Sequence, residues 1–367
     1  MSVNYSIEMN NAHKDSASVR DKFHKGRPVV EVFSSMVKGE PIATHVDAKL
    51  ADKAMDYIKG LGEKASAGDT SAMAELNALR VIEIQPILQE EIKLLGIFGS
   101  YQNMGWDETI YIETYKHTAQ SVAQQAEGVD VTFPTIVKDR YPIAPVTISG
   151  GYSVNYRQLA VGDASKENEG MNEVRKMIMN KAVLYVAKTI VDKIQNAKGV
   201  KYFYENEGLV KEDVDALLTK IRRFGRPSVL GDYALLSEFT PWAGFNSTVS
   251  GIKGISDALI NEINDNGFLA RYNGAILSEI PNPYDLTQID GDNFKPLFPA
   301  GVGFVVPQGG QTSAIQTFTQ GGLTSFSGND VVTGETMTRF DLAVAADVAK
   351  GREYEVGVIV DSKLGTL

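Results

Sequence analysis

Residues 111–160 read YIETYKHTAQSVAQQAEGVDVTFPTIVKDRYPIAPVTISGGYSVNYRQLA, and this stretch decides the fold. It opens on a β-branched and aromatic run, and apolar residues then alternate with polar ones at Val129, Val131 and Phe133, and again at Val146, Ile148 and Val154. A period of two is typical of β-strands. Residues 119–130 (AQSVAQQAEGVD) lie between the arms and offer little apolar bulk for packing. We therefore predict a long β-hairpin with a small polar tip.

A hairpin of this length predicts contact with another subunit. An isolated two-stranded hairpin is only marginally stable in water. An arm that reaches too far to fold back onto its own domain is therefore expected to find its partner surface on a second copy of the chain.

A long helix is predicted directly after the hairpin, over residues 170–197. Its broad apolar face would carry Met171, Val174, Met177, Ile178, Leu184, Ala187, Ile190, Val191 and Ile194. At 1.5 Å per residue such a helix would be roughly 40 Å long. A helix like this could simply belong to the core of a compact domain. A projecting hairpin that leads straight into an oversized helix is a less common combination, and the two together support the inference that the chain contacts other subunits.

The N-terminal part of the chain changes character near residue 45. Residues 1–44 are polar and without periodicity, which predicts a loose arm. Two helices are predicted next, over residues 47–61 and 71–83, because Gly60 and Gly62 would end the first and Pro86 would interrupt the second. Residues 87–97 are expected to add a further helical piece.

An α/β pattern begins after Gly225. Strands are predicted at 228–232, 275–280 and 301–306, with helices at 234–239 and 255–263. The tail alternates strictly again at 340–344 and 354–360, with a turn at Lys350 and Gly351 between.

Composition excludes several classes of function. The chain has 367 residues, is 43% hydrophobic and has no cysteine, which rules out disulfides, thiolate metal sites and cysteine nucleophiles. No apolar run approaches the roughly 20 residues of a membrane span. The N-terminus lacks the pattern of a secretory signal, so we expect synthesis in the cytoplasm. A formal net charge of −10 argues against a surface that grips nucleic acid through its phosphates.

Catalytic motifs are missing from the sequence. Neither a Gly-x-Ser-x-Gly elbow nor a phosphate-binding Gly-x-x-x-x-Gly-Lys loop occurs. None of the four histidines, His13, His24, His45 and His117, pairs with another at helical spacing. Residues 290–293 (DGDN) lack the sixth-position glycine and closing glutamate of an EF-hand. We therefore predict no enzyme, no catalytic residue, no cofactor and no metal.

The order of these elements resembles the major capsid protein of tailed bacteriophages, the Hong Kong 97-type fold, over residues 111–360. The stretches that carry the resemblance are residues 123–128 (AQQAEG), 131–133 (VTF), 143–149 (IAPVTIS), 229–232 (VLGD), 339–344 (RFDLAV) and 356–360 (VGVIV). Each stretch alone is unspecific, and their order along the chain is what matches.

The resemblance implies an α+β fold of six parts. These are an N-terminal arm (1–46), a helical segment (47–106), an extended β-hairpin loop (107–160), a peripheral domain with a long spine helix (161–224), an axial α/β domain (225–306) and return strands of the peripheral domain (307–367). The extended loop would lie over a neighbouring subunit, and we place that contact at the tip residues Gln120, Val122, Gln125, Glu127 and Gly128.

The implied function is assembly of an icosahedral head around a phage genome. Its partners would be many copies of the chain in hexamers and pentamers, scaffold and portal proteins, possible decoration proteins, and double-stranded DNA enclosed without sequence-specific binding. The protein would be assembled in the host cytoplasm and reside in the virion, with no membrane contact. Two alternatives stay open at this point, an encapsulin-like nanocompartment shell and a cytoplasmic α/β enzyme.

One departure from the family concerns covalent cross-linking. Some members join subunits through a lysine on the extended loop, whereas residues 119–130 here contain none, and Lys116 and Lys138 lie on the arms. We therefore predict a shell without covalent cross-links.

Overall fold

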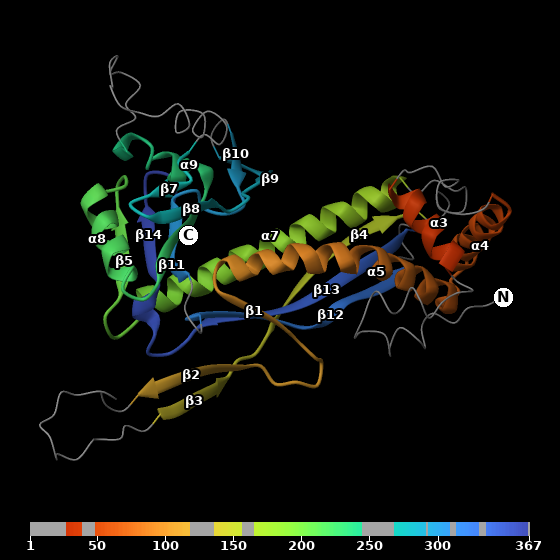
Figure 1. The fold of residues 1–367 in the computed structure, drawn as a ribbon. Helices are drawn as coiled ribbons and strands as arrows, with labels where there is room; N and C mark the ends of the chain where they lie inside the picture. Colours follow the sequence, from red (N-terminus) through yellow and green to blue (C-terminus); the bar gives the residue numbers. More distant parts are fainter. Residues whose placement is uncertain are drawn as a thin grey trace, which may run out of the picture.

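The computed structural model describes residues 27–38, 48–117, 136–155, 165–243, 268–290, 293–308, 313–329 and 335–365. Within these ranges the chain mixes helices with one four-stranded sheet, one six-stranded sheet and two two-stranded ribbons. Figure 1 shows the four-stranded sheet along one side of a long helix and the six-stranded sheet near the C-terminal end of that helix, with one of the ribbons projecting away from the body.

Three helices open the described chain: α3 (Arg27–Lys38), α4 (Ala48–Ser66) and α5 (Thr70–Ile92). The prediction of a loose arm over residues 1–44 is wrong at α3, because Val32 and Phe33 are buried in the main core. The rest of that range that lies before residue 27 and after residue 38 is outside the described residues.

Both predicted helix ends near residues 60 and 86 are also wrong. Helix α4 continues through Gly60 and Gly62, and α5 continues through Pro86. Glycine costs a helix only about 1 kcal/mol, and proline about 3 kcal/mol. The burial of Leu61 between the two glycines and of Ala65 after them, and of Leu88 and Ile92 after the proline, offsets those costs.

The four-stranded sheet has the order β1-β12-β13-β4. Its strands are β1 (Ser100–Met104), which follows the short 3-10 helix η2 (Lys93–Ile97), and β12 (Ile315–Asn329), β13 (Thr336–Val348) and β4 (Val146–Val154). Strand β1 is parallel to β12, and the other two pairings are antiparallel. On β13 the buried residues Phe340, Leu342 and Val344 form the face that packs against helices α5 and α7.

Helix α7 (Ser165–Gln195) confirms the predicted long helix and has 31 residues. Seven of the nine apolar residues predicted for its face are buried, and Leu184 packs against the same core from a half-buried position. The seven are Met171, Val174, Ile178, Ala187, Ile190, Val191 and Ile194. The helix is therefore the central support on which the four-stranded sheet lies (Figure 1).

The six-stranded sheet has the order β5-β14-β11-β6-β8-β7. Its strands are β5 (Tyr202–Asn206), β14 (Gly357–Asp361), β11 (Val302–Gln308), β6 (Arg226–Gly231), β8 (Ala275–Glu279) and β7 (Arg271–Tyr272). Helices α8 (Lys211–Ile221) and α9 (Tyr233–Ser237) share one apolar cluster with one face of this sheet. The other face joins the main core, where the rings of Phe98 and Phe304 meet edge to face at 5.4 Å.

Two strands pair differently from the sequence-based expectation. The prediction extended the second hairpin arm to Val154, but Val146–Val154 forms β4 at the edge of the four-stranded sheet, because Pro142 and Pro145 interrupt the arm before it. The tail was expected to return to the peripheral domain as a whole, yet β13 and β14 separate into the two different sheets. Strand pairing thus joins β5 and β14 to the sheet that contains β6, β7, β8 and β11.

The remaining elements are the ribbon of β2 (Tyr111–His117) and β3 (Ile136–Pro142), the ribbon of β9 (Tyr284–Asp290) and β10 (Asn293–Pro296), and the short helices η3 (Pro241–Ala243) and η4 (Glu353–Glu355). The predicted helix at 255–263 lies outside the described residues.

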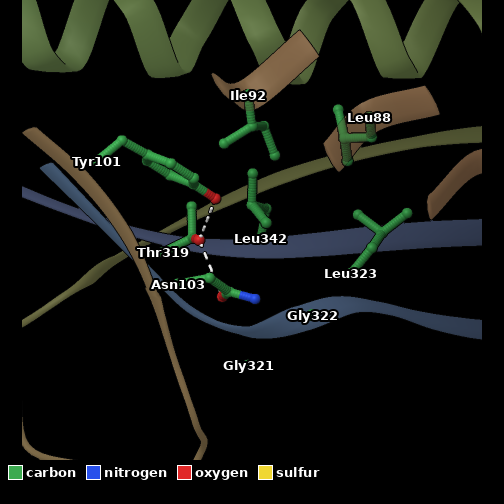
Figure 2. Close-up of a pocket in the computed structure, with 9 residues that line it drawn as sticks. All are labelled: Leu88, Ile92, Tyr101, Asn103, Thr319, Gly321, Gly322, Leu323 and Leu342. Atoms are coloured by element: carbon green, nitrogen blue, oxygen red, sulfur yellow. Dashed lines mark hydrogen bonds between the residues drawn. The ribbon is translucent and has the colours of Figure 1, made fainter. Parts of the chain in front are cut away.

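A small cavity marks the place where β12 bulges beneath α5. Figure 2 shows the apolar residues Leu88, Ile92 and Leu342 on one side of it and a chain of polar side chains on the other. In this chain the Tyr101 hydroxyl lies 2.8 Å from Thr319 Oγ1, and the Thr319 hydroxyl donates to Asn103 at 3.1 Å. Its volume of about 20 Å³ is enough for roughly one water molecule. The cavity is therefore a packing feature that ties β1 to β12 and has no room for a larger ligand.

Candidate assembly surfaces

The predicted contact residues Gln120, Val122, Gln125, Glu127 and Gly128 lie outside the described residues. The structure does describe the two strands that lead to them. These strands, β2 and β3, pair antiparallel over seven residues, from Tyr111 opposite Pro142 to His117 opposite Ile136. The predicted hairpin is thus confirmed in its two strands, and we call this pair the extended ribbon.

The extended ribbon packs on its own chain only at its root, among the described residues. There, Ile110 and Ile112 are buried against Phe318 of β12 and against Ala345 and Ala349 at the end of β13. Farther out, Tyr115 and Val137 are exposed. Figure 1 shows the ribbon on the side of the four-stranded sheet opposite to α5 and α7. The ribbon therefore leaves the body with its outer half uncovered.

A ladder of charged and aromatic side chains stiffens the exposed face of the extended ribbon. Glu113 lies 2.8 Å from Lys138 Nζ and 3.8 Å from Arg140 Nε. The guanidinium of Arg140 lies over the Tyr111 ring at 3.5 Å from its centre, a cation–π contact. The hydrogen bond between Lys138 and Glu113 lowers the pKa of the carboxyl and raises the pKa of the amine. These cross-strand contacts stabilise a ribbon that would be marginal alone.

The outer face of the four-stranded sheet is covered at one end and open at the other. Residues alternate along β13, so Ala345, Asp341, Arg339 and Met337 share one face. The ribbon root covers the Ala345 end of that face. At the other end Met337 is 52% exposed, and Phe326 of β12, opposite Arg339, is 58% exposed. We call the surface formed by Phe326, Met337 and Arg339 the open sheet face.

A second ribbon presents exposed aromatic rings near the six-stranded sheet. In β9 and β10, Tyr284 is 62% exposed and Phe294 is 43% exposed. The Asn282 side chain holds the base of this ribbon by donating to Asp232 at 2.7 Å and to the Phe298 carbonyl at 2.6 Å, and by accepting from the Phe298 amide at 2.8 Å. The rings are therefore carried on a firmly anchored support.

Sequence reasoning missed the open sheet face and the β9–β10 ribbon. The sequence does carry a signal for the open sheet face: Phe326 and Met337 are large apolar residues on a strand face that otherwise carries polar residues such as Arg339 and Asp341. Recognising it requires the register of β12 on β13, and that register includes a bulge between Gln320 and Thr324. For the second, the short strand β10 contains a single large apolar residue, too little for a periodicity argument.

The described residues contain no cluster of three or more histidine, aspartate or glutamate side chains that could hold a metal ion. His13, His24 and His45 lie outside these residues, and His117 is described only by its backbone in β2. Among the helices that are described, none has the length and apolar character needed to cross a membrane.

A hollow of about 620 Å³ lies between the two large sheets. Apolar residues that include Ile97, Phe98 and Val306 line part of it. Its lining also includes Arg352 and Glu355, which pair with each other through two hydrogen bonds of 2.7 and 2.6 Å. The two side chains thus form an ion pair, which stabilises the turn between β13 and β14.

A protein-family model matches the chain over residues 9–360, and its description is "SPbeta prophage-derived putative capsid protein YonB". No curated protein matches the chain. The match to the family model covers almost the whole length of the chain.

Several solved structures are similar at low identity. A chain of Mycobacterium phage Che8 is 15% identical with a TM-score of 0.42, over 70% of this chain and 85% of that chain. The capsid of the cyanophage P-SCSP1u is 10% identical with a TM-score of 0.44, over 71% and 86%. The SrpI encapsulin of Synechococcus elongatus is 10% identical with a TM-score of 0.45, over 75% and 89%.

Proposed function

Since the chain belongs to the YonB family of capsid proteins, we propose that it is the major head protein of a tailed double-stranded DNA phage and that its copies join into a closed icosahedral shell. The observation that carries this proposal is the extended ribbon, which packs on its own chain at the root and leaves its outer half uncovered. A marginal two-stranded ribbon gains stability when a neighbouring copy covers it.

The tip of the extended ribbon would make the contact with the neighbour, through Gln120, Val122, Gln125, Glu127 and Gly128. We place this contact on the neighbour's open sheet face. Two properties support that choice: Phe326 and Met337 expose apolar area to solvent, and the ion pair of Arg339 with Asp341 places polar groups beside that area. Interfaces commonly combine an apolar centre with polar residues at the rim.

The six-stranded sheet, with α8 and α9, would form the unit that gathers at fivefold and sixfold centres in pentamers and hexamers. The four-stranded sheet with α7 would form the peripheral unit. In this assignment the axial unit contains residues 225–306 together with β5, α8 and β14, since strand pairing and the shared apolar cluster join them. The aromatic rings of the β9–β10 ribbon belong to the same unit.

The enclosed DNA would be held without sequence-specific contacts. A net charge of −10 disfavours a lining that binds phosphates tightly. This charge balance suits a shell that is built first, on a scaffold protein, and then filled through a portal, and we propose partners of these kinds. Assembly in the host cytoplasm belongs to the same proposal.

Deletion of residues 120–128 tests the role of the ribbon tip. The purified full chain is expected to form closed particles in electron micrographs. The deleted chain is expected to stay soluble and folded, with an unchanged circular dichroism spectrum, but to elute as a small species on gel filtration. As a matched control, a Gly-Ser segment of equal length in place of residues 120–128 keeps the length of the hairpin and should fail to assemble in the same way.

Other outcomes would favour other functions. If the deleted chain still formed normal shells, the role assigned to the tip would be refuted. Small particles filled with another protein rather than with DNA would indicate a nanocompartment. A full chain that stays monomeric and turns over a substrate would indicate an enzyme.

A further inference from the structure

Asp347 is a buried carboxylate that connects three elements of the fold. It lies on β13, near the root of the extended ribbon. Its Oδ2 accepts a hydrogen bond of 3.2 Å from the Tyr141 hydroxyl of β3, and its Oδ1 lies 3.1 Å from Lys193 Nζ of α7. Oδ1 also accepts from the amide of Val348 at 2.8 Å. Both oxygens are thus paired, which is what a buried charge requires.

Tyr141 is the residue of the extended ribbon that contacts Asp347. Its hydroxyl also lies 3.3 Å from the Val348 carbonyl, and Lys350 Nζ lies 4.3 Å from the centre of its ring. Burial, together with the negative charge of Asp347, raises the pKa of the Tyr141 hydroxyl well above its ordinary value. The hydroxyl therefore stays protonated and acts as the donor.

The other contacts at the ribbon root fix its direction less strongly. The cluster of Ile110 and Ile112 with Phe318 is apolar, and apolar burial has no directional preference. Strand β2 has one side-chain hydrogen bond to the body in the described chain, from Gln316 Nε2 to the Glu113 carbonyl at 3.1 Å. Strand β3 is tied to the body through Tyr141, and hydrogen bonds are directional.

We propose that Asp347 is a positioning residue that fixes the direction of the extended ribbon and couples it to helix α7. The ribbon lies on one side of the four-stranded sheet and α7 on the other (Figure 1). The Asp347 carboxylate contacts both, through Tyr141 of the ribbon and Lys193 of α7. Seven residues at about 3.3 Å each make the ribbon about 23 Å long, so a tilt of about 10° at the root moves its end by about 4 Å.

The consequence for assembly rests on the proposed function. A displacement of this size at the ribbon end would change which part of a neighbouring copy the tip can reach. Asp347 would then influence the curvature of the shell and the uniformity of particle size.

Spin labels test the proposal, because the chain has no native cysteine. One label at Val137→Cys in β3 and one at Lys188→Cys on the exposed side of α7 report the distance between ribbon and helix in unassembled protein. Pulsed electron paramagnetic resonance should give one narrow distance distribution. In Asp347→Asn and Tyr141→Phe the distribution should become at least twice as broad.

Asp341→Asn serves as the matched control. It changes the same residue type on the same strand, where Asp341 pairs with Arg339 at 2.7 Å away from the ribbon root, and it should leave the distribution unchanged. If Asp347→Asn does not fold, Tyr141→Phe and Lys193→Met decide the question, since each removes one partner of the carboxylate. An unchanged distribution in the Tyr141 and Lys193 variants would overturn the proposal.

Particle assembly of the same variants separates this inference from the proposed function. A broadened distribution with shells of mixed size supports both. With a broadened distribution and normal shells, the positioning role of Asp347 stands, and the role of the ribbon in assembly falls. With an unchanged distribution the positioning role falls, whatever the shells look like.

Discussion

At the scale of single residues, the buried pair of Arg80 and Glu167 connects three elements. The two side chains are 1% and 2% exposed and hydrogen-bonded to each other. Arg80 also donates to Asn77 at 2.8 Å, and Tyr152 of β4 donates to Glu167 at 2.7 Å. The pair therefore joins α5, β4 and the first turn of α7. Removing one partner would leave a charge buried without compensation.

We predict that Arg80→Met lowers the free energy of unfolding by about 3–5 kcal/mol, because Glu167 would lose its counter-charge. The double variant Arg80→Met/Glu167→Leu should regain most of this loss, since well-packed apolar residues often replace a buried ion pair without cost. Urea unfolding measures both. Arg339→Met, at the exposed pair with Asp341, should cost about 0–1 kcal/mol. Equal losses at the two sites would contradict the account.

Glu238 makes the stability of the folded chain depend on pH. Burial, together with the nearby charge of Asp361, raises the pKa of Glu238 above its ordinary value of 4.5. Folding therefore favours the neutral carboxyl. The stability that this group contributes is fully present below pH 4.5 and is lost as the pH rises through the higher folded value.

We accordingly predict that Glu238→Gln raises the melting temperature at pH 7 and that the gain disappears near pH 4. Thermal melts at the two pH values measure it. Glu173→Gln, on the exposed side of α7, should leave the melting temperature unchanged at both. A variant less stable than the native chain at pH 7 would count against the stated effect of Asp361.

At the scale of elements, α7 supports the four-stranded sheet. Ile190 is 1% exposed in the main core. We predict that Ile190→Asp prevents folding, because burying an unpaired carboxylate costs more than a typical domain's stability margin allows. Circular dichroism and solubility report the result. Lys188→Asp, two residues earlier on the exposed side, should fold normally. A soluble Ile190→Asp chain with a native melting temperature would show that this face is not core.

The open sheet face is the other element-scale test. Two populations of the chain, one with Gln125→Cys and one with Met337→Cys, can be assembled together, and native cysteines cannot interfere. A disulfide that joins one chain of each kind can only form between copies. We predict such mixed pairs on non-reducing gels. As a control, Leu50→Cys on α4 takes the place of Met337→Cys, because Leu50 is also exposed. This combination should give far fewer mixed disulfide pairs.

The sequence predicted local elements well where burial followed a regular period. The apolar face of α7 follows from a period of 3.6, and β2 follows from its β-branched and aromatic run. The alternating residues Val146, Ile148 and Val154 did predict a strand, but that strand is β4 of the four-stranded sheet and not part of the extended ribbon. Glycine and proline in α4 and α5 misled the prediction, because packing of Leu61 and Leu88 outweighed their local cost. The separation of β13 and β14 into different sheets depends on pairing between distant strands, which a local pattern does not encode. The contact residues at the ribbon tip stay a prediction.

At the scale of the whole molecule, the chain forms a body of two sheets with surfaces left for neighbours. The edge-to-face contact of Phe98 with Phe304 lies where the core of one sheet meets that of the other. The extended ribbon, the open sheet face and the β9–β10 ribbon all expose apolar or aromatic side chains outside this core. A capsid subunit needs this combination, because a firm body must present several contacts at fixed distances.

The most direct test of this account is a cryo-electron microscopy reconstruction of particles assembled from the full chain. We predict a closed shell in which residues 118–135 of each copy rest on the surface of a neighbouring copy. A reconstruction in which those residues pack against their own chain would contradict the account, and so would a chain that forms no closed particle.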